Sequence, residues 1–222
     1  SPTLEGFHLQ NGHIEGRGAG LYIAAGARPT VRDNFIHDNT ATGFEGQGGG
    51  IYYAGEDSPV LERNTVYDNR AAEGAGLYLA GGSPRVWNNV VYGNVADWVG
   101  GGLHLTEGTP EVWNNTFYSN SALLGGGIYV LGGSLSVSNT IMARHSGYGL
   151  YMAGGTSALD YSAWWGNTPA HYTGTGVIVG GHNLYADPRF LSAATGDLRL
   201  LKDSPCIDAA DPHTVVSQDR EG

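Results

Sequence analysis

The chain of 222 residues contains 37 glycines and 9 prolines, with a hydrophobic content of 41% and a formal net charge of −10. Glycine inside a helix costs about 1 kcal/mol relative to alanine, so the composition excludes a helical protein, and the hydrophobic content excludes a disordered linker. The acidic balance argues against nucleic acid as a partner, and no apolar run reaches the ~18 residues of a membrane span.

A glycine motif recurs along the whole chain. The last glycine of each Gly-x-Gly-apolar motif follows the previous one after 22 to 30 residues, at Gly20, Gly50, Gly76, Gly102, Gly127, Gly149 and Gly176. One unit, residues 109–133, holds three short segments with strand periodicity: Glu111–Trp113, Thr116–Tyr118 and Ile128–Val130. Such units predict a parallel β-solenoid of about seven coils with three strands per coil, stacked ~4.8 Å apart. A β-sandwich, the alternative, would not keep one residue type at one place in every coil.

Alternation assigns two faces to the glycine-flanked strands. The inward pairs are Leu21/Ile23, Ile51/Tyr53, Leu77/Leu79, Leu103/Leu105, Ile128/Val130, Leu150/Met152 and Val177/Val179. The outward column between them reads Tyr22, Tyr52, Tyr78, His104, Tyr129, Tyr151 and Ile178. A second outward column holds His37, Tyr67, Tyr92 and Tyr118, and a third holds Trp87 and Trp113.

The outward aromatic columns have three interpretations. Stacked rings stabilise parallel strands by themselves; an exposed aromatic stripe binds the apolar faces of sugar rings; and the stripe could face a neighbouring domain of the same precursor. The residues predicted to bind a ligand are Tyr22, Tyr52, Tyr78, His104, Tyr129, Tyr151, Trp87, Trp98 and Trp113.

Asparagines mark two corners of the repeat. Asn64, Asn89 and Asn115 precede one strand, and Asn39, Asn69, Asn94 and Asn120 follow it, so we expect structural ladders of stacked amides rather than ligands. The segments after the second corner vary in length and are expected to be loops on one edge of the rod, beside the tyrosine column: Thr40–Gln47, Arg70–Glu73, Val95–Val99 and 121–124. A cleft, if present, would lie between these loops and the tyrosine column.

These motifs resemble a known family. GGGIY, GAGLY and GGGLH, together with Phe117-x-x-Asn120, are similar to repeats of polymorphic outer-membrane adhesins, and the chain resembles right-handed parallel β-helix proteins of the pectate-lyase-like type. Residues 187–211, DPRFLSAATGDLRLLKDSPCIDAAD, resemble the end of bacterial extracellular β-helix proteins. The resemblance implies an extracellular or cell-surface location and a chain that is a fragment of a longer one. The coils are expected over residues 1–181 and a cap or wrap-around segment over 182–222, where Leu198, Leu200 and Leu201 would pack against the final coil and Cys206 and Ile207 would be buried.

The resemblance also raises the question of catalysis, because many β-helix relatives process polysaccharides. Ca²⁺ needs six to eight oxygen ligands, but no outward column is expected to hold two successive acidic residues, so no metal or other cofactor is predicted. His104 between Tyr78 and Tyr129, oriented by Asp97 or Glu107, is the candidate acid–base group of a uronan lyase. A tolerated substitution in a tyrosine column is the competing interpretation. The preferred function is a non-catalytic surface module, an adhesin, stalk or carbohydrate-binding domain. Its partner would be a polysaccharide or glycan surface, or neighbouring domains of the precursor.

Overall fold

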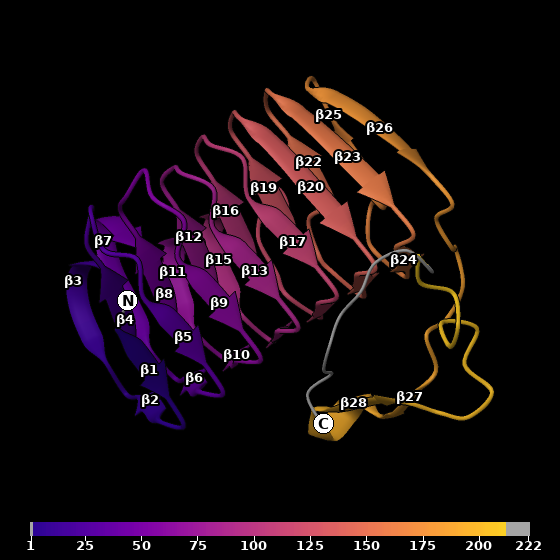
Figure 1. Cartoon of the computed structure of the whole chain (residues 1–222), viewed down its shortest axis with the longest axis horizontal. Coiled ribbons are helices and arrows are strands. Elements are labelled where there is room, and N and C mark those ends of the chain that lie inside the picture. The colour runs from indigo at the N-terminus through magenta and orange to yellow at the C-terminus, as the bar shows by residue number, and fades with distance from the viewer. Residues whose placement is uncertain (1, 212–222) are drawn as a thin grey trace.

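The coils stack along the long axis of the molecule as a parallel β-solenoid (Figure 1). A computed structural model describes residues 2–211. Each coil contributes one strand to each of three long sheets, and every neighbouring pair of strands within these sheets is parallel. The predicted fold class is confirmed.

Four sheets run along the coils and are named here A to D. Sheet A comprises β1 (Thr3–Glu5), β5 (Thr30–Arg32), β9 (Val60–Glu62), β13 (Arg85–Trp87), β17 (Glu111–Trp113), β20 (Ser134–Ser138), β23 (Thr156–Asp160) and β26 (Val177–Gly181). Sheet B comprises β2 (His8–Gln10), β6 (Phe35–His37), β10 (Thr65–Tyr67), β14 (Val90–Tyr92), β18 (Thr116–Tyr118), β21 (Ile141–Ala143) and β24 (Ala163–Trp165). Sheet C comprises β3 (His13–Arg17), β7 (Thr40–Gln47), β11 (Arg70–Glu73) and β15 (Val95–Val99). Sheet D comprises β4 (Leu21–Ile23), β8 (Ile51–Tyr53), β12 (Leu77–Leu79), β16 (Leu103–Leu105), β19 (Ile128–Val130), β22 (Leu150–Met152) and β25 (Tyr172–Gly174).

The core is a set of apolar columns inside the coils. The middle residue of each three-residue strand of sheets A and B points inward, and in the five-residue strands β20 and β23 the second and fourth residues do so. In sheet D the first and third residues of each strand from β4 to β22 point inward. Because the pairing is in register, each inward side chain packs on its equivalent in the next coil; Val66, Val91 and Phe117 are successive members of one column. Burial of these columns supplies the main driving force for stacking the coils.

The asparagines form the two predicted ladders inside the corners. Asn69 is fully buried; its Nδ2 donates to Oδ1 of Asn94 at 2.9 Å and to the carbonyl of Ile36 at 2.9 Å, while its Oδ1 accepts from Nδ2 of Asn39 at 3.0 Å. The other ladder repeats this pattern from Asn34 through Asn64 and Asn89 to Asn115. In the later coils, Thr140 and Ser162 continue the ladder of Asn115, and His145 and Asn167 continue the ladder of Asn69.

Sheet C corrects the expectation that the variable segments are loops. Three of the four segments are strands, and the fourth, residues 121–124, forms isolated bridges to Val95 and Val99. Small inward side chains allow this extra side of the coil, because Ala41, Ala71, Ala96 and Ala122 form a compact column of their own. The eight-residue β7 pairs with the four-residue β11 through a register shift, so a difference in length appears as a bulge rather than as a loop.

The seventh glycine motif was assigned to the wrong sheet. β26, which follows Gly176, pairs with β23 in sheet A, and the seventh strand of sheet D is β25. In this register Ile178 packs against the core while Val177 and Val179 are exposed, the reverse of the predicted orientation. The strand was expected in sheet D, where its first and third residues would point inward, but in sheet A its second residue does so. Side chains alternate with a period of two, so this difference of one position exchanges the inward and outward residues.

The C-terminal segment lies along the side of the rod rather than over its end. Residues 182–185 still follow the coil, since the backbone amide of Trp164 donates to the carbonyl of Leu184. β27 (Phe190–Ser192), the 3₁₀ turn η1 (Ala193–Thr195) and β28 (Asp197–Leu200) then form an antiparallel hairpin, visible beside the coils in Figure 1. This hairpin contacts the outer face of sheet B, where the Phe190 ring meets Tyr118 and Gly196 lies against the hydroxyl of Tyr92.

The leucines of the C-terminal segment therefore do not cover the final coil as predicted. Leu198 and Leu200 are half-buried in the hairpin, and Leu201 is exposed. Cys206 is half-buried and Ile207 is exposed, so the prediction of burial is wrong for Ile207. Residues 212–222 of the predicted cap lie outside the described residues.

Candidate functional site

The first six predicted members of the outward column of sheet D are aligned in register, although the His104 ring is tilted against Tyr78 and edge-on to Tyr129. The register aligns Tyr22, Tyr52, Tyr78, His104, Tyr129 and Tyr151 on successive coils, with Thr173 in place of the predicted Ile178. Ring centroids are 5.2 Å apart between Tyr22 and Tyr52 and 5.0 Å apart between Tyr52 and Tyr78, with nearly parallel planes. In such a column each ring covers the faces of its neighbours, so a ligand can reach mainly ring edges.

The middle of this column is also covered from outside, which contradicts the expected exposed stripe. Tyr52, Tyr78 and His104 are 5%, 7% and 3% exposed, whereas Tyr22 at the end of the column is 50% exposed and Tyr129 and Tyr151 are half-buried. A flat aromatic platform over the central coils is therefore absent from the described part of the chain.

The cover comes from the ends of the sheet C strands. Arg17, Gln47 and Glu73 occupy equivalent positions on β3, β7 and β11, and a short glycine-rich corner separates each from the outward residue of sheet D. The Arg17 guanidinium lies 5.5 Å from the centre of the Tyr52 ring, and Gln47 Nε2 donates to Glu73 Oε2 at 2.9 Å. These side chains form a polar lid over the aromatic column.

His104 lies beneath this lid and is not available as an acid–base group. Burial lowers its pKa from the ordinary 6.5 to about 4, so the imidazole is neutral at neutral pH. Glu73 is the carboxylate that the fold brings near it, but its Oε2 is 3.6 Å from Nδ1, too far for a hydrogen bond. Burial also raises the pKa of Tyr78 and of Tyr129, so neither phenol is activated as a base.

Asp97 does not orient His104 as predicted. Its side chain is exposed on β15 and pairs with Arg70, Oδ1 to Nη2 at 3.6 Å. The carboxylate near His104 is Glu73, at the end of β11. The segment Arg70–Glu73 was expected beside the tyrosine column, but the repeat does not show which coil its last side chain reaches.

The remaining predicted aromatic residues lie on three other surfaces. Trp87 and Trp113 stack on the outer face of sheet A at 5.7 Å and are half-buried. On sheet C, Trp98 is exposed and contacts the exposed Phe44 ring edge-on at 5.4 Å, across the shorter β11. On sheet B, His37 stacks on Tyr67 at 4.5 Å and Tyr67 on Tyr92 at 5.0 Å.

One acidic pair contradicts the expectation that no outward column holds successive carboxylates. Asp38 and Asp68 occupy the same corner on adjacent coils, directly after His37 and Tyr67 of the paired strands β6 and β10. Burial and the neighbouring Asp38 raise the pKa of Asp68, while Asp38 itself contacts His37, Oδ2 to Nδ1 at 2.7 Å. Within residues 2–211, however, no group of three His, Cys, Asp or Glu side chains is arranged to hold a metal ion.

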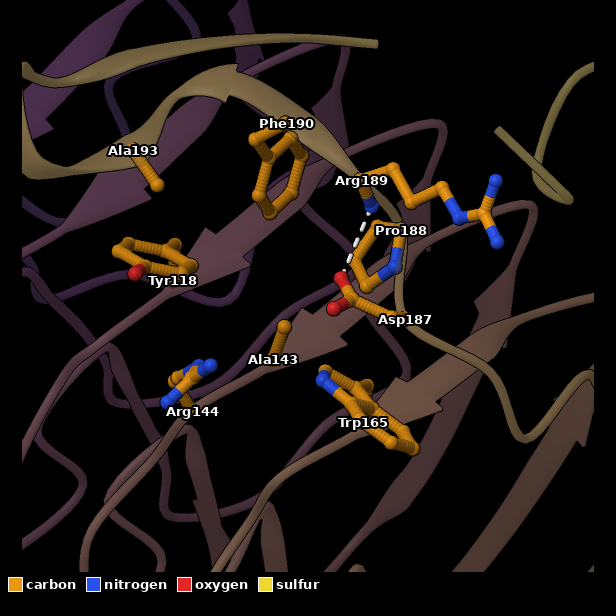
Figure 2. A pocket seen from close by; sticks show the side chains of 9 residues that line it. All are labelled: Tyr118, Ala143, Arg144, Trp165, Asp187, Pro188, Arg189, Phe190 and Ala193. Atoms are coloured by element: carbon orange, nitrogen blue, oxygen red, sulfur yellow. Dashed lines mark hydrogen bonds between the residues drawn. The ribbon is translucent and has the colours of Figure 1, made fainter. Parts of the chain in front are cut away.

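A cleft forms where the C-terminal hairpin meets sheet B (Figure 2), and we call it the cap cleft. Its volume is about 200 Å³, and it is lined by Tyr118, Ala143, Arg144, Trp165, Asp187, Pro188, Arg189, Phe190 and Ala193. Ala143 stands in the outward column of sheet B between Tyr118 and Trp165, so this column lacks one ring at that coil. No sequence motif indicates the cleft, because one wall comes from residues 118–165 of the coils and the other from residues 187–193 of the C-terminal segment.

The polar groups of the cap cleft are unusually free of partners. All eight other arginines in the described residues form ion pairs, whereas Arg144 forms none. The Asp187 carboxylate accepts a hydrogen bond from the backbone amide of Arg189 at 2.9 Å and forms no ion pair within the described residues, and Figure 2 shows it directed toward Ala143. The Arg189 side chain turns away from the cleft to pair with Asp203, Nη1 to Oδ2 at 2.6 Å.

The part of the chain that the structure describes contains no helix with the length and apolar character to cross a membrane.

Comparison with known proteins addresses the fold. No curated protein and no solved structure matches the chain. The family model described as "Right handed beta helix region" matches residues 5–158, which span all of the coils up to β23. The match covers more than half of the chain, and the stacked parallel sheets agree with it. The chain therefore belongs to the right-handed β-helix family.

Proposed function

We propose that the chain is a non-catalytic β-helix module of an extracellular or cell-surface protein that binds carbohydrate through aromatic side chains on its outer faces. The observation that carries this proposal is Trp165, a ring that is 37% exposed at the edge of a polar cleft and stacks on no other aromatic ring of the described residues. A free indole face beside hydrogen-bonding groups suits a sugar ring, whose apolar face packs on the aromatic surface while its hydroxyls bond to the polar groups.

The burial of His104 is the reason for preferring a binding module over a uronan lyase. A general base must lie within hydrogen-bond reach of the proton that it removes, and a side chain that is 3% exposed beneath Glu73 cannot meet a polymeric substrate. The lyase alternative therefore has no observation in its favour at this site.

The rigidity of the coils supports a role as an adhesin or stalk. Buried asparagine ladders run through both corners of sheet B and fix each coil to the next. A solenoid of this kind presents outward side chains at fixed spacing, which suits attachment to an extended glycan.

The test is a glycan array followed by turnover assays on every glycan that binds. We expect binding without cleavage, and no absorbance of unsaturated uronate products. The Trp165→Ala variant should lose at least tenfold in affinity, while Leu131→Ala, which removes an exposed but non-aromatic side chain, should bind as the unmodified chain does. Cleavage that disappears in His104→Ala would overturn the proposal in favour of the lyase. Absence of binding to any glycan would overturn it outright.

A further inference from the structure

We propose that the cap cleft binds one sugar unit carrying a carboxylate or sulfate group, with Arg144 pairing with the acidic group and Trp165 stacking on the ring. This inference rests on the proposed function, whose carbohydrate class it narrows to acidic sugars, and it assigns that function to a single site. The argument rests on three features: a free cation, a free ring face, and a negative group at the opposite side of the cleft.

Arg144 is the free cation. In a chain with a net charge of −10, the other eight described arginines are each neutralised by an acidic neighbour. Arg144 is exposed at the corner after β21, and its aliphatic chain lies beside Gly166 of the next coil. An unpaired guanidinium in a cleft favours an anionic group that offers two oxygens to its N–H donors, such as a carboxylate or a sulfate.

Trp165 supplies the ring face, and its neighbour in the column is Ala143, whose small, buried side chain places no second ring against the indole. Elsewhere in the sheet B column, successive rings such as Tyr67 and Tyr92 stack at 5.0 Å and cover each other. Between Tyr118 and Trp165 the column holds only the methyl group of Ala143, so the two rings are two coils apart, a separation of ~9.6 Å at the usual strand spacing. Phe190 meets Tyr118 edge-on at 5.5 Å and closes the far side of the cleft (Figure 2).

Asp187 places a negative charge at the side of the cleft opposite Arg144. Its carboxylate points toward Ala143 and forms no ion pair with Arg144 or Arg189 (Figure 2). An acceptor at one side and a guanidinium at the other suit a ring with hydroxyl donors at one end and a negative group at the other. A volume of about 200 Å³ is below the 300–1,000 Å³ typical of sites for drug-sized ligands, so the cleft fits one ring, such as the terminal unit of a chain.

Titration calorimetry with three monosaccharides tests the proposal: glucuronate, glucose 6-sulfate and neutral glucose. We expect both acidic sugars to bind at least tenfold more tightly than glucose. Arg144→Gln should remove this preference without changing the affinity for glucose. Trp165→Ala should weaken all three, and Trp165→Phe should restore most of the loss. Arg85→Gln is the matched control, because Arg85 also lies beside a tryptophan, 5.2 Å from the Trp87 ring, but on sheet A and paired with Glu111.

The outcomes separate the two proposals. Equal affinity for the acidic and neutral sugars, or an acidic preference that persists in Arg144→Gln, overturns the assignment of the cap cleft. If the array in the same preparation shows glycan binding that is insensitive to Arg144, carbohydrate binding stands and only the acidic-sugar site fails. If neither the array nor calorimetry shows binding, both fail. If just one of the two acidic sugars binds more tightly than glucose, the result supports the proposal and identifies which acidic group the cleft accepts.

Discussion

Individual residues show how strongly burial changes chemistry along the outward columns. His104 stands in a column of tyrosines, yet it is buried under the lid of Arg17, Gln47 and Glu73 and makes no hydrogen bond with either ring nitrogen. His145 replaces an asparagine in a ladder, is fully buried, and accepts a hydrogen bond from the backbone amide of Asn120 at 3.1 Å. Burial lowers the pKa of His145 to about 3, so both imidazoles are neutral in the folded chain at neutral pH.

These two histidines predict a loss of stability in mild acid. The unfolded chain takes up protons as the pH falls below the ordinary histidine pKa of about 6.5, whereas the folded chain does so only near pH 3 to 4. Their contribution is therefore complete above about pH 6.5 and declines as the pH falls through this window. At 1.36 kcal/mol per pH unit, His104 alone should account for about 2 kcal/mol between pH 7.5 and pH 5.

Urea unfolding of the unmodified chain and of His104→Tyr at these two pH values measures this contribution. Tyrosine is the residue found at the equivalent position of both neighbouring coils, so the variant should fold and should lose about 2 kcal/mol less than the unmodified chain on acidification. An identical loss in the two proteins would show that His104 is not responsible.

Single elements are held in register by their corners rather than by their own length. Strands of three residues bury one or two side chains each, so the corner amides decide which residues face inward. Asn115 is 1% exposed; its Nδ2 donates to the carbonyls of Val86 and Trp113, and its Oδ1 accepts from the backbone amide of Asn89. The preceding Asn114 has a φ of 57° and is half-buried, so the two adjacent asparagines have different tasks.

Replacing the two asparagines should therefore have very different effects. Asn115→Ala leaves several buried backbone groups without partners, and we expect it to lower the free energy of unfolding by about 3 kcal/mol or more, at 1–3 kcal/mol for each unsatisfied group. Asn114→Gly should change it by less than about 1 kcal/mol, because glycine adopts a positive φ readily. Chemical unfolding of both variants tests this, and similar losses in the two would contradict the ladder's structural role.

The molecule as a whole depends on close contact between backbones of successive coils. A glycine stands directly before each of four sheet D strands, at Gly20, Gly50, Gly76 and Gly102, and each lies close to a backbone carbonyl of the next coil. A β-carbon on Gly50 would lie 2.6 Å from the carbonyl oxygen of Gly76. The glycine two positions earlier has the positive φ instead, 66° for Gly48. The Gly-x-Gly motif therefore combines a left-handed turn with a close approach of two coils.

Alanine at Gly76 should disturb the stacking of the entire rod. Its β-carbon would meet the carbonyl oxygen of Gly102 at 2.5 Å, and overpacking of this kind costs about 1–3 kcal/mol. Gly181→Ala is the control, because its nearest neighbour, Asp160 Oδ1, would be at an ordinary 3.7 Å. Thermal unfolding should show a lower Tm for Gly76→Ala and little change for Gly181→Ala; equal midpoints would contradict the close-approach argument.

The repeat period by itself determined the parallel coils, the inward apolar columns and the asparagine ladders. Each of these features needs only that the same residue recur at the same place in every coil, and stacking then brings equivalent residues together. The prediction of inward and outward residues is wrong at Val177–Gly181, where the chain joins sheet A and not sheet D. The spacing of the glycine motifs does not determine which sheet a strand joins.

Tertiary structure decided which outward side chains are exposed to solvent and to a ligand. The lid over Tyr52, Tyr78 and His104 comes from sheet C, whose strands are irregular in length and gave no periodic signal. The cap cleft joins Tyr118 to Phe190, residues 72 positions apart whose contact depends on how the C-terminal hairpin folds back on sheet B. Exposure and cleft formation arise from contacts between segments outside the repeat, so no local pattern could encode them.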